Sequence, residues 1–439
     1  MKCTTIEKLI MDKTEIQYKS RKRLKEYQLH KIKETIAYVK ENSKFYREYL
    51  KDIKAEYINS FKDFKNVPFT NSKDIIQNPF GFLCVPQKNI KRVVTLKTSG
   101  TTGYEKRIYF TEKDLELTVD FFSYGMKSLV DEGDRILVMF PGNSYGSIGY
   151  LLKRALEKIN IYCYVQGIMK NTSDTADIIK NKHINCIVGI PIQLLQFSRS
   201  QSSIFKDRID KILLSSDYVP ETLVNEMTDK FKTKVFTHYG MTEMGYGGAV
   251  QCETLNGYHL RENDIYFEIV DPTTGREIKY GEPGEVVFTT LKSEGMPLIR
   301  YKTGDIASFS KNCCKCGSFL KTMNKVLGRI DNRFEISSHK YIYMSQLDEI
   351  ILSFPQVMNY SLHIEDYNKI YVYLTLFNQC DFNKLSLEIL KGIKNITFIE
   401  DELLNNIIEF KIINSTEDKQ IKNSMLKRKI YDNRKKVYL

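Results

Sequence analysis

The sequence lacks the features that mark a membrane protein, a secreted protein or a nucleic-acid-binding protein. No apolar run approaches the roughly 20 residues that a membrane-spanning helix needs. The N-terminal stretch has no apolar core of a signal peptide, so we expect a cytoplasmic protein. No RNA-binding aromatic motif or zinc-finger spacing accompanies the net charge of +12, and the lysines are spread evenly. We therefore expect no nucleic-acid partner and no membrane partner.

What the 439-residue chain does contain is an alternation of strand and helix patterns after a helical N-terminal region. Buried-strand patterns such as RILVMF, INCIVGI and KVFTHYG are separated by segments with helical periodicity. This alternation predicts an α/β fold with parallel βαβ units, whose ligands lie at the carboxyl ends of strands. Beyond residue 245 the pattern becomes β-rich, and DPTTG predicts a hairpin turn. We expect a large domain over residues 1–330 and a small, mobile α+β domain over residues 331–439.

Two glycines and four hydroxyl side chains stand between two predicted strands in LKTSGTTGYEKRIYFT, residues 96–111. The glycines allow successive backbone N–H groups to turn inward as an anion nest, and the hydroxyls can donate to phosphate oxygens. The stretch is not a P-loop, which needs a lysine directly after the second glycine and then a helix. By itself it also fits a polar hairpin turn. The candidate phosphate-binding residues are Thr98, Ser99, Gly100, Thr101, Thr102, Gly103 and Lys106.

Three further motifs carry candidate polar groups. THYGMTEMG follows a strand pattern and presents Thr242 and Glu243, a hydroxyl suited to phosphate beside a carboxylate suited to Mg²⁺. RYKTGDIA places Asp305 after a glycine turn, where a carboxylate could accept hydrogen bonds from both ribose hydroxyls. GRIDNRFEI lies where the β-rich region gives way to the last segment. Taken singly, the three motifs also fit a strand cap, an Asx turn and a charged linker.

These four motifs, in this order and spacing, resemble the adenylate-forming superfamily of acyl-CoA synthetases, adenylation domains and luciferases. NSKFYREYL, VPFTNSKDI, SSDYVPETL and GEVVFTTL add a closer resemblance to phenylacetate–CoA ligases and coenzyme F390 synthetase-like proteins. The resemblance covers residues 35–336. It implies an enzyme that joins an organic carboxylic acid, with an aryl acid as the expectation, to the AMP part of ATP, releases pyrophosphate, and then transfers the acyl group to a thiol.

The sequence departs from the family where the second half-reaction is concerned. A glycine-rich segment that helps to admit coenzyme A is replaced after GRIDNRFEI by SSHKYIYMSQLDEII. Coenzyme A is the acceptor in the related ligases, but a phosphopantetheine thiol of an acyl carrier protein, an amine or a protein thiol stay open as alternatives. A non-catalytic nucleotide-binding protein on the same fold is a second hypothesis.

The resemblance also implies roles for single residues. It assigns residues 98–106 to the phosphates of ATP, Thr242 to a phosphate, Glu243 to Mg²⁺ and Asp305 to the ribose. The family favours glycine at the position of Ser216, and Leu426 replaces a glycine before the candidate catalytic lysine. The remaining assignments are Ser216 and Asp217 beside the adenine, Tyr239 and Gly240 leading into the phosphate contacts, Arg329 on the nucleotide, Asp331 as the hinge and Lys427 as the catalytic lysine.

The acid itself is expected below the strand end FPGNSYGS. Phe140, Gly142, Tyr145 and His238 would suit a flat aromatic acid, although Phe and Tyr are also ordinary core residues. No carboxylate is placed to bind an amino group, as an amino-acid-activating domain would need. The expected partner is a small carboxylic acid, with an acyl carrier protein as a further candidate, and the chain could be a monomer or a dimer.

Nine cysteines, an odd number without an export signal, indicate reduced thiols. C-x₆-H and C-x-C together supply four ligands, enough for a closed tetrahedral Zn²⁺ site. Relatives of this ligase group have comparable cysteine positions, which favours structural zinc over free thiols. The candidate ligands are Cys252, His259, Cys314 and Cys316, with Cys313 as an alternative.

Overall fold

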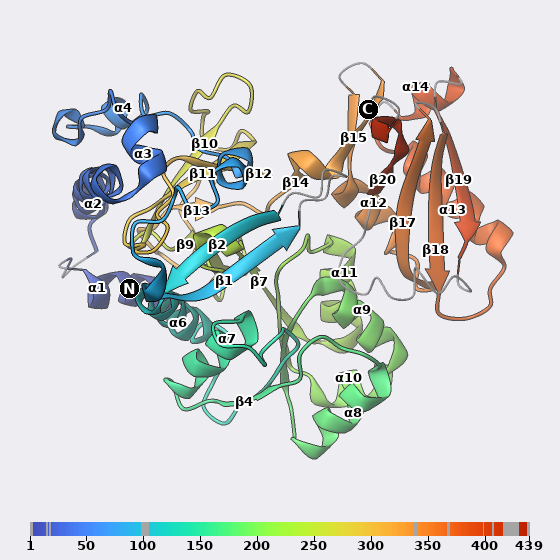
Figure 1. The fold of residues 1–439 in the computed structure, drawn as a ribbon. Coiled ribbons are helices and arrows are strands. Elements are labelled where there is room, and N and C mark those ends of the chain that lie inside the picture. The colour runs from blue at the N-terminus through green and yellow to red at the C-terminus, as the bar shows by residue number, and fades with distance from the viewer. Residues whose placement is uncertain are drawn as a thin grey trace. The chain divides into compact units, whose positions relative to one another are not determined.

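The computed structural model describes residues 3–14, 16, 19–97, 105–337, 340–366, 369–397, 399–405, 408–415 and 430–436 (Figure 1). The predicted phosphate loop at residues 98–103 and the candidate lysine Lys427 lie outside these residues. The chain divides into two compact units, one formed by Met1–Ile168 with Phe236–Val326 and the other by Met169–Val235 with Leu327–Leu439. The predicted domain boundary at residue 330 stays a prediction.

Helices open the first unit, as the sequence predicted. A capping box begins the first of them: the Thr4 hydroxyl accepts a hydrogen bond from the Glu7 N–H, and the Glu7 carboxylate accepts one from the Thr4 N–H. Glu7 is buried and also accepts from the Ser318 hydroxyl, which ties this helix to the β-rich region. The helices are α1 (Thr5–Lys13), α2 (Arg21–Asn42), α3 (Lys44–Tyr49), α4 (Phe61–Phe64) and α5 (Ser72–Gln77).

A two-stranded hairpin, β1 (Ile90–Lys97) with β2 (Glu105–Thr111), flanks the predicted phosphate loop. The strands are antiparallel, which confirms the predicted strands on both sides of that loop. At the end of β2 the buried Asp114 carboxylate caps α6 (Glu112–Met126) by accepting from the Thr111 N–H. The same carboxylate accepts from the N–H groups of Glu294 at 2.7 Å and Gly295 at 3.0 Å. One acid therefore fixes the end of β2 against the β-rich region.

The β-rich region of the first unit consists of antiparallel strand pairs that belong to two sheets. In β10 and β11 every residue is buried, including the polar Glu268, Glu285 and Thr289. The hairpin predicted at DPTTG is confirmed by the antiparallel pairing of these two strands. The strands are β10 (Ile265–Val270), β11 (Gly284–Thr290), β12 (Tyr301–Ala307), β8 (Ala249–Gln251), β9 (Tyr258–Leu260) and β13 (Thr322–Met323).

Parallel strand pairs lie in both units, as the alternating pattern predicted. The first unit contains β3 (Arg135–Val138) parallel to β4 (Tyr162–Val165), joined by α7 (Ile148–Glu157). The second unit contains β5 parallel to β6. Its N-terminal elements are α8 (Thr172–Asn181), β5 (Cys186–Gly189), α9 (Pro191–Ser200), α10 (Ser202–Arg208), β6 (Lys211–Leu214) and α11 (Glu221–Asn225).

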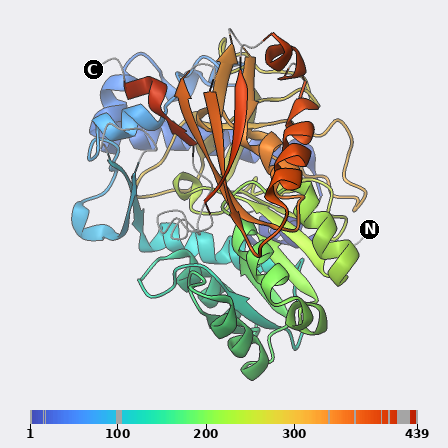
Figure 2. The same cartoon turned by 90° about the vertical axis from the view of Figure 1, so that its right-hand side faces the viewer.

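The C-terminal part of the second unit is an α+β arrangement, as expected. Its four-stranded sheet has the order β19-β18-β17-β20, and α13 lies alongside it in both views (Figures 1 and 2). The elements are β14 (Gly328–Arg329), β15 (Arg333–Ser337), β16 (Lys340–Tyr343), α12 (Met344–Ile351), β17 (Val357–Asp366), β18 (Lys369–Leu376), α13 (Phe382–Lys394), α14 (Ile399–Leu404), β19 (Glu409–Asn414) and β20 (Ile430–Asp432).

One arginine joins the two sequence segments of the second unit. Arg199 at the end of α9 donates to the backbone carbonyls of Leu352, Phe354 and Val357 and forms an ion pair with Glu226. A buried guanidinium needs several acceptors, and these carbonyls just after α12 supply them.

The predicted mixed α/β fold with parallel strands is confirmed. In the part of the chain described here, no helix is long and apolar enough to cross a membrane.

Candidate active site

A lysine, a glutamate and a tyrosine from three different segments meet inside the first unit. Lys106 on β2 and Glu243 form an ion pair, although 137 residues separate them in the sequence. The Tyr301 hydroxyl lies 3.3 Å from the Lys106 Nζ and 3.3 Å from the Glu243 Oε1. The exposed fractions are 9%, 6% and 1% for Lys106, Glu243 and Tyr301. Because an unpaired buried charge costs several kcal/mol, the two charges are stable here only as a pair.

The backbone before Glu243 has little freedom. β7 (Lys234–Tyr239) is followed by Gly240, where an added Cβ would lie 2.1 Å from the Tyr246 carbonyl oxygen. The chain then enters a short 3₁₀ turn, Thr242–Met244, that Gly245 ends with a φ of 69°. Only glycine fits the close approach at Gly240. The motif HYGMTE therefore sets the direction in which Glu243 enters the interior, and Thr242 stands beside it at partial exposure.

A second buried carboxylate, Asp305, lies in the same unit. Its Oδ2 accepts a hydrogen bond from the Tyr239 hydroxyl at 2.9 Å, and both residues are buried. The sequence placed Asp305 after a glycine turn, whereas the structure places it within β12. The strand pairing with β11 shifts register between Glu285 and Val287, and Gly304 has a φ of 77° there. A β-bulge at Gly304 therefore takes the place of the turn that we expected before Asp305.

The second unit holds the other candidates for nucleotide contacts. Ser216 has a φ of 75°, a left-handed conformation that favours glycine. The family resemblance predicts glycine at this position, so the backbone conformation suits the expected residue although the side chain differs. Asp217 Oδ1 accepts from the Tyr218 N–H at 2.9 Å. Arg329 ends β14 and Asp331 is exposed in a short 3₁₀ turn. The adenine, nucleotide and hinge roles of these residues stay predictions.

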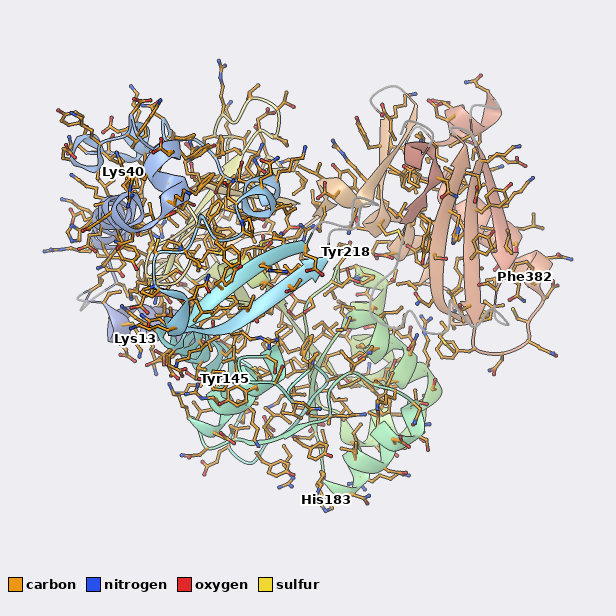
Figure 3. All side chains as sticks on the ribbon, in the orientation of Figure 1. Lys13, Lys40, Tyr145, His183, Tyr218 and Phe382 are labelled. Atoms are coloured by element: carbon orange, nitrogen blue, oxygen red, sulfur yellow. The ribbon has the colours of Figure 1, made fainter. Side chains whose placement is uncertain are left out.

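The predicted acid-pocket residues have different environments. His238 on β7 lies against Phe121 and Phe122 of α6, with ring centroids 6.0 and 6.1 Å away. Phe140 is buried, and a Cβ on Gly142 would lie 2.3 Å from the Val165 Cγ1. Tyr145, labelled in Figure 3, is 42% exposed and donates to the Glu112 carboxylate.

The aromatic surroundings of His238 determine its charge. Burial lowers the pKa of His238 to about 4, because the ring cannot be hydrated when it is charged. The imidazole is therefore neutral at pH 7. A neutral ring packed against Phe121 and Phe122 makes an apolar aromatic wall with them, which the pattern FF in α6 could have indicated and we did not predict.

The predicted cysteine–histidine set comes together in the first unit. The ligand atoms of Cys252, His259, Cys314 and Cys316 all lie within 4.8 Å of one another. The Sγ atoms of Cys252 and Cys314 are 3.6 Å apart, and the Cys316 Sγ is 3.3 Å from the His259 Nε2. A tetrahedral Zn²⁺ with Zn–S bonds of about 2.3 Å has sulfur–sulfur edges of about 3.8 Å. The donor set and its spacing fit zinc, and the exposed Cys313 is not a member.

Tyr301 is the functional candidate that the sequence did not single out. It stands four residues before Asp305 in the motif RYKTGD, which is the only signal that could have pointed to it. Its partners Lys106 and Glu243 come from other motifs, so the contact depends on tertiary structure.

The mixed α/β fold and the motifs that carry Lys106, Glu243 and Asp305 in the first unit agree with the class that the sequence resembles, the adenylate-forming enzymes. The chain belongs to the family of AMP-binding enzymes, whose sequence profile matches residues 46–291. The predicted membership is confirmed.

Curated relatives agree with this assignment. The chain is 28% identical over 361 residues to the phenylacetate-coenzyme A ligase of Thermus thermophilus, with 80% of each chain covered. It is 25% identical to the phenylacetate-coenzyme A ligase of Pseudomonas putida, with 78% of each chain covered. The predicted likeness to phenylacetate–CoA ligases is confirmed.

Solved structures share the fold at low sequence identity. A 2-hydroxyisobutyryl-CoA ligase in complex with 2-HIB-AMP superposes with a TM-score of 0.78 at 18% identity, covering 93% of this chain and 89% of that one. The o-succinylbenzoate CoA synthetase of Bacillus subtilis in complex with OSB-AMP superposes with a TM-score of 0.51 at 19% identity, covering 73% and 65%. These likenesses establish the fold.

Proposed function

We propose that the protein joins a small organic carboxylic acid to ATP as acyl-AMP, with release of pyrophosphate, and then transfers the acyl group to the thiol of coenzyme A. The observation that carries this proposal is the buried group of Lys106, Glu243 and Tyr301 in a member of the AMP-binding enzyme family. The curated phenylacetate-coenzyme A ligases, matched over about four fifths of the chain, support the thiol as acceptor.

The chain's own residues would act through charge. A carboxylate and a triphosphate are both anions, so the site must neutralise charge as the acid approaches the α-phosphorus. Lys106 supplies the cation near the phosphates, and Thr242 supplies a hydroxyl donor. Asp305, held by Tyr239, would accept from the ribose hydroxyls. The loop at residues 98–103 is the proposed phosphate cradle, and Lys427 the proposed lysine of the first half-reaction.

Mg²⁺ would be held by Glu243, whose buried carboxylate now faces Lys106. Carboxylate oxygen is the ligand that Mg²⁺ takes together with substrate phosphates, so the residue fits the ion. When bound, the ion would neutralise developing phosphate charge.

For the acid we propose an aryl carboxylate. The support is the neutral His238 ring packed against Phe121 and Phe122, an arrangement that offers flat apolar contacts and no charge to bind a second ionised group. Phe140, Gly142 and Tyr145 stay predicted pocket residues.

Pyrophosphate exchange tests the proposal directly. The protein is incubated with MgATP, labelled pyrophosphate and a panel of aryl, alkyl and amino acids, and label entering ATP is counted. Exchange with an aryl acid and coenzyme A thioester formation are the expected results. Exchange without a thioester would indicate a carrier protein or an amine as acceptor, and no exchange with any acid would favour a non-catalytic nucleotide-binding protein.

We also propose that Cys252, His259, Cys314 and Cys316 hold a structural Zn²⁺. The support is the closed set of four soft or borderline donors, three of them buried. Burial raises the pKa of Cys316 to about 12 and also raises the pKa of Cys252, so binding a cation would displace protons from these thiols. Metal analysis of protein purified without chelator should find one zinc per chain.

Three further expectations belong to this proposal. Asp331 would be the hinge on which the region from residue 331 to 439 turns between half-reactions. A cytoplasmic location agrees with the reduced thiols that the metal site needs. The acyl carrier protein and the oligomeric state remain to be tested by binding and by light scattering.

A further inference from the structure

We propose that Tyr301 is a positioning residue for the first half-reaction, because its hydroxyl holds both Lys106 and Glu243 and lets either charge turn to a ligand without leaving the other unsatisfied. This inference rests on the proposed function. Tyr301 belongs to none of the residues that the family resemblance assigned to ATP, Mg²⁺ or the acid.

The geometry places the phenol oxygen beside the ion pair, at 3.3 Å from each of the two charged atoms. The hydroxyl donates to the Glu243 Oε1 at 3.3 Å and accepts from the Lys106 Nζ at 3.3 Å. A hydroxyl carries one donor and two acceptor positions, so both bonds can exist at once. Its ring adds a second attraction, since the Lys106 Nζ lies 5.9 Å from the ring centroid.

The ring itself is held rigidly. Tyr301 is 1% exposed, and its ring lies 5.4 Å from that of Phe288 on the neighbouring strand β11, with which it is in register. A bridge to Thr70 secures the other side of the backbone. A hydroxyl on a fixed strand loses little freedom when it makes a hydrogen bond, which makes it an effective support for the more flexible Lys106 and Glu243 side chains.

The contact has a consequence for ligand binding. Lys106 and Glu243 neutralise each other in this structure, and each must loosen that contact to engage a phosphate or a cation. Without the hydroxyl, each of the two charges would lose one of its hydrogen-bond partners among the described residues, and opening the pair for MgATP would cost more. The hydroxyl therefore lowers the cost of opening the pair.

Calorimetric titration of MgATP, without any acid so that no turnover occurs, tests this on the full chain. Tyr301→Phe removes only the hydroxyl and should weaken MgATP affinity about tenfold, the effect of one hydrogen bond to a charged group. In steady-state assays the KM for MgATP should rise by the same factor while the KM for the acid stays within twofold.

Tyr46→Phe is the matched control. Tyr46 is also fully buried in the first unit, but its hydroxyl accepts from the backbone N–H of Ile299 and contacts no charged group in the bonds described. The Tyr46→Phe variant should be less stable than the wild-type chain but bind MgATP with the same affinity. Titrations are made at a temperature where circular dichroism shows both variants folded.

Should Tyr301→Phe not fold, Tyr301→His serves as the second variant, since it keeps a polar ring but moves the donor, and its MgATP affinity should also fall. Unchanged affinity in either folded variant overturns the inference and leaves the proposed function standing. Failure of the wild-type chain to bind MgATP overturns the proposed function itself, and the inference with it.

Discussion

Two buried polar clusters in the first unit differ in how their charges are satisfied. Lys106, Glu243 and Tyr301 combine a cation, an anion and a hydroxyl, so the group is complete without any ligand. The cysteine–histidine cluster contains only electron-pair donors within 4.8 Å of one another, and nothing in it supplies positive charge. With the roles proposed above, the first cluster would open for a substrate, while the second would stay closed around a cation.

The largest expected effect breaks the first cluster. Glu243→Gln removes the negative charge that we propose holds Mg²⁺ and should lower acid-dependent pyrophosphate exchange at least about 1000-fold. The fold should persist at a cost in stability, because the amide oxygen can still accept from Lys106 and Tyr301 while the charge of Lys106 is left unpaired, so exchange is measured where circular dichroism shows the variant folded.

Glu116→Gln is the control for that change. Glu116 is partly exposed and pairs with Arg154 and Lys158. Its replacement by glutamine removes the same charge and an ion pair, but outside the cluster. Its exchange rate should match wild type. Full exchange by the Glu243 variant would mean that the metal ligand lies elsewhere.

Loss of the proposed metal from the second cluster should lower the stability of the protein. Chelation of the proposed zinc, or Cys252→Ser, should lower the melting temperature by about 5–10 °C, because metal binding contributes folding free energy. Calorimetric scans before and after zinc is restored measure this. Cys313→Ser should change neither metal content nor melting temperature, since Cys313 is exposed and outside the cluster. An unchanged melting temperature in zinc-free protein would contradict a structural role for the metal, and with it the proposed difference between the two clusters.

His238 differs from both clusters, because it packs against aromatic rings and not against a group of opposite charge. Its pKa is lowered to about 4 in the folded chain and lies near 6.5 when unfolded, so below pH 6.5 the unfolded state binds more protons. Stability is thus fully present above pH 6.5 and falls as the pH drops toward 4. The loss between pH 7 and pH 5 should be about 2 kcal/mol.

Urea unfolding at the two pH values measures this contribution. His238→Asn cannot titrate in this range and should show a pH dependence smaller by that amount. An equal pH dependence in the two proteins would mean that the ring is hydrated.

The smallest effect concerns Asp305. Tyr239→Phe removes the hydroxyl that orients this carboxylate and should raise the KM for ATP about fivefold, with little change in kcat. Tyr258→Phe is the control, because its hydroxyl accepts from Thr237 and meets no carboxylate in the bonds described. Equal KM values in both variants would show that the ribose is held by other groups.

The sequence by itself determined the elements and the motifs. Helical periodicity, the Thr111–Asp114 capping box and the glycines at 240 and 304 depend on neighbours a few residues away, so short stretches specify them. The cysteine–histidine cluster was predictable with the help of the family resemblance, because its residue types and spacings alone also fit free thiols. The bulge at Gly304 was mistaken for a turn, since both put a glycine at positive φ.

Only the tertiary structure decided which groups meet. Lys106, Glu243 and Tyr301 lie on three elements separated by 137 and 58 residues, and nothing in the local pattern says that one hydroxyl will lie within hydrogen-bond distance of both charges. The aromatic wall of Phe121 and Phe122 beside His238 is equally non-local. The physical reason is that local preferences fix backbone conformation, whereas burial forces distant polar and aromatic groups to find partners when the core closes.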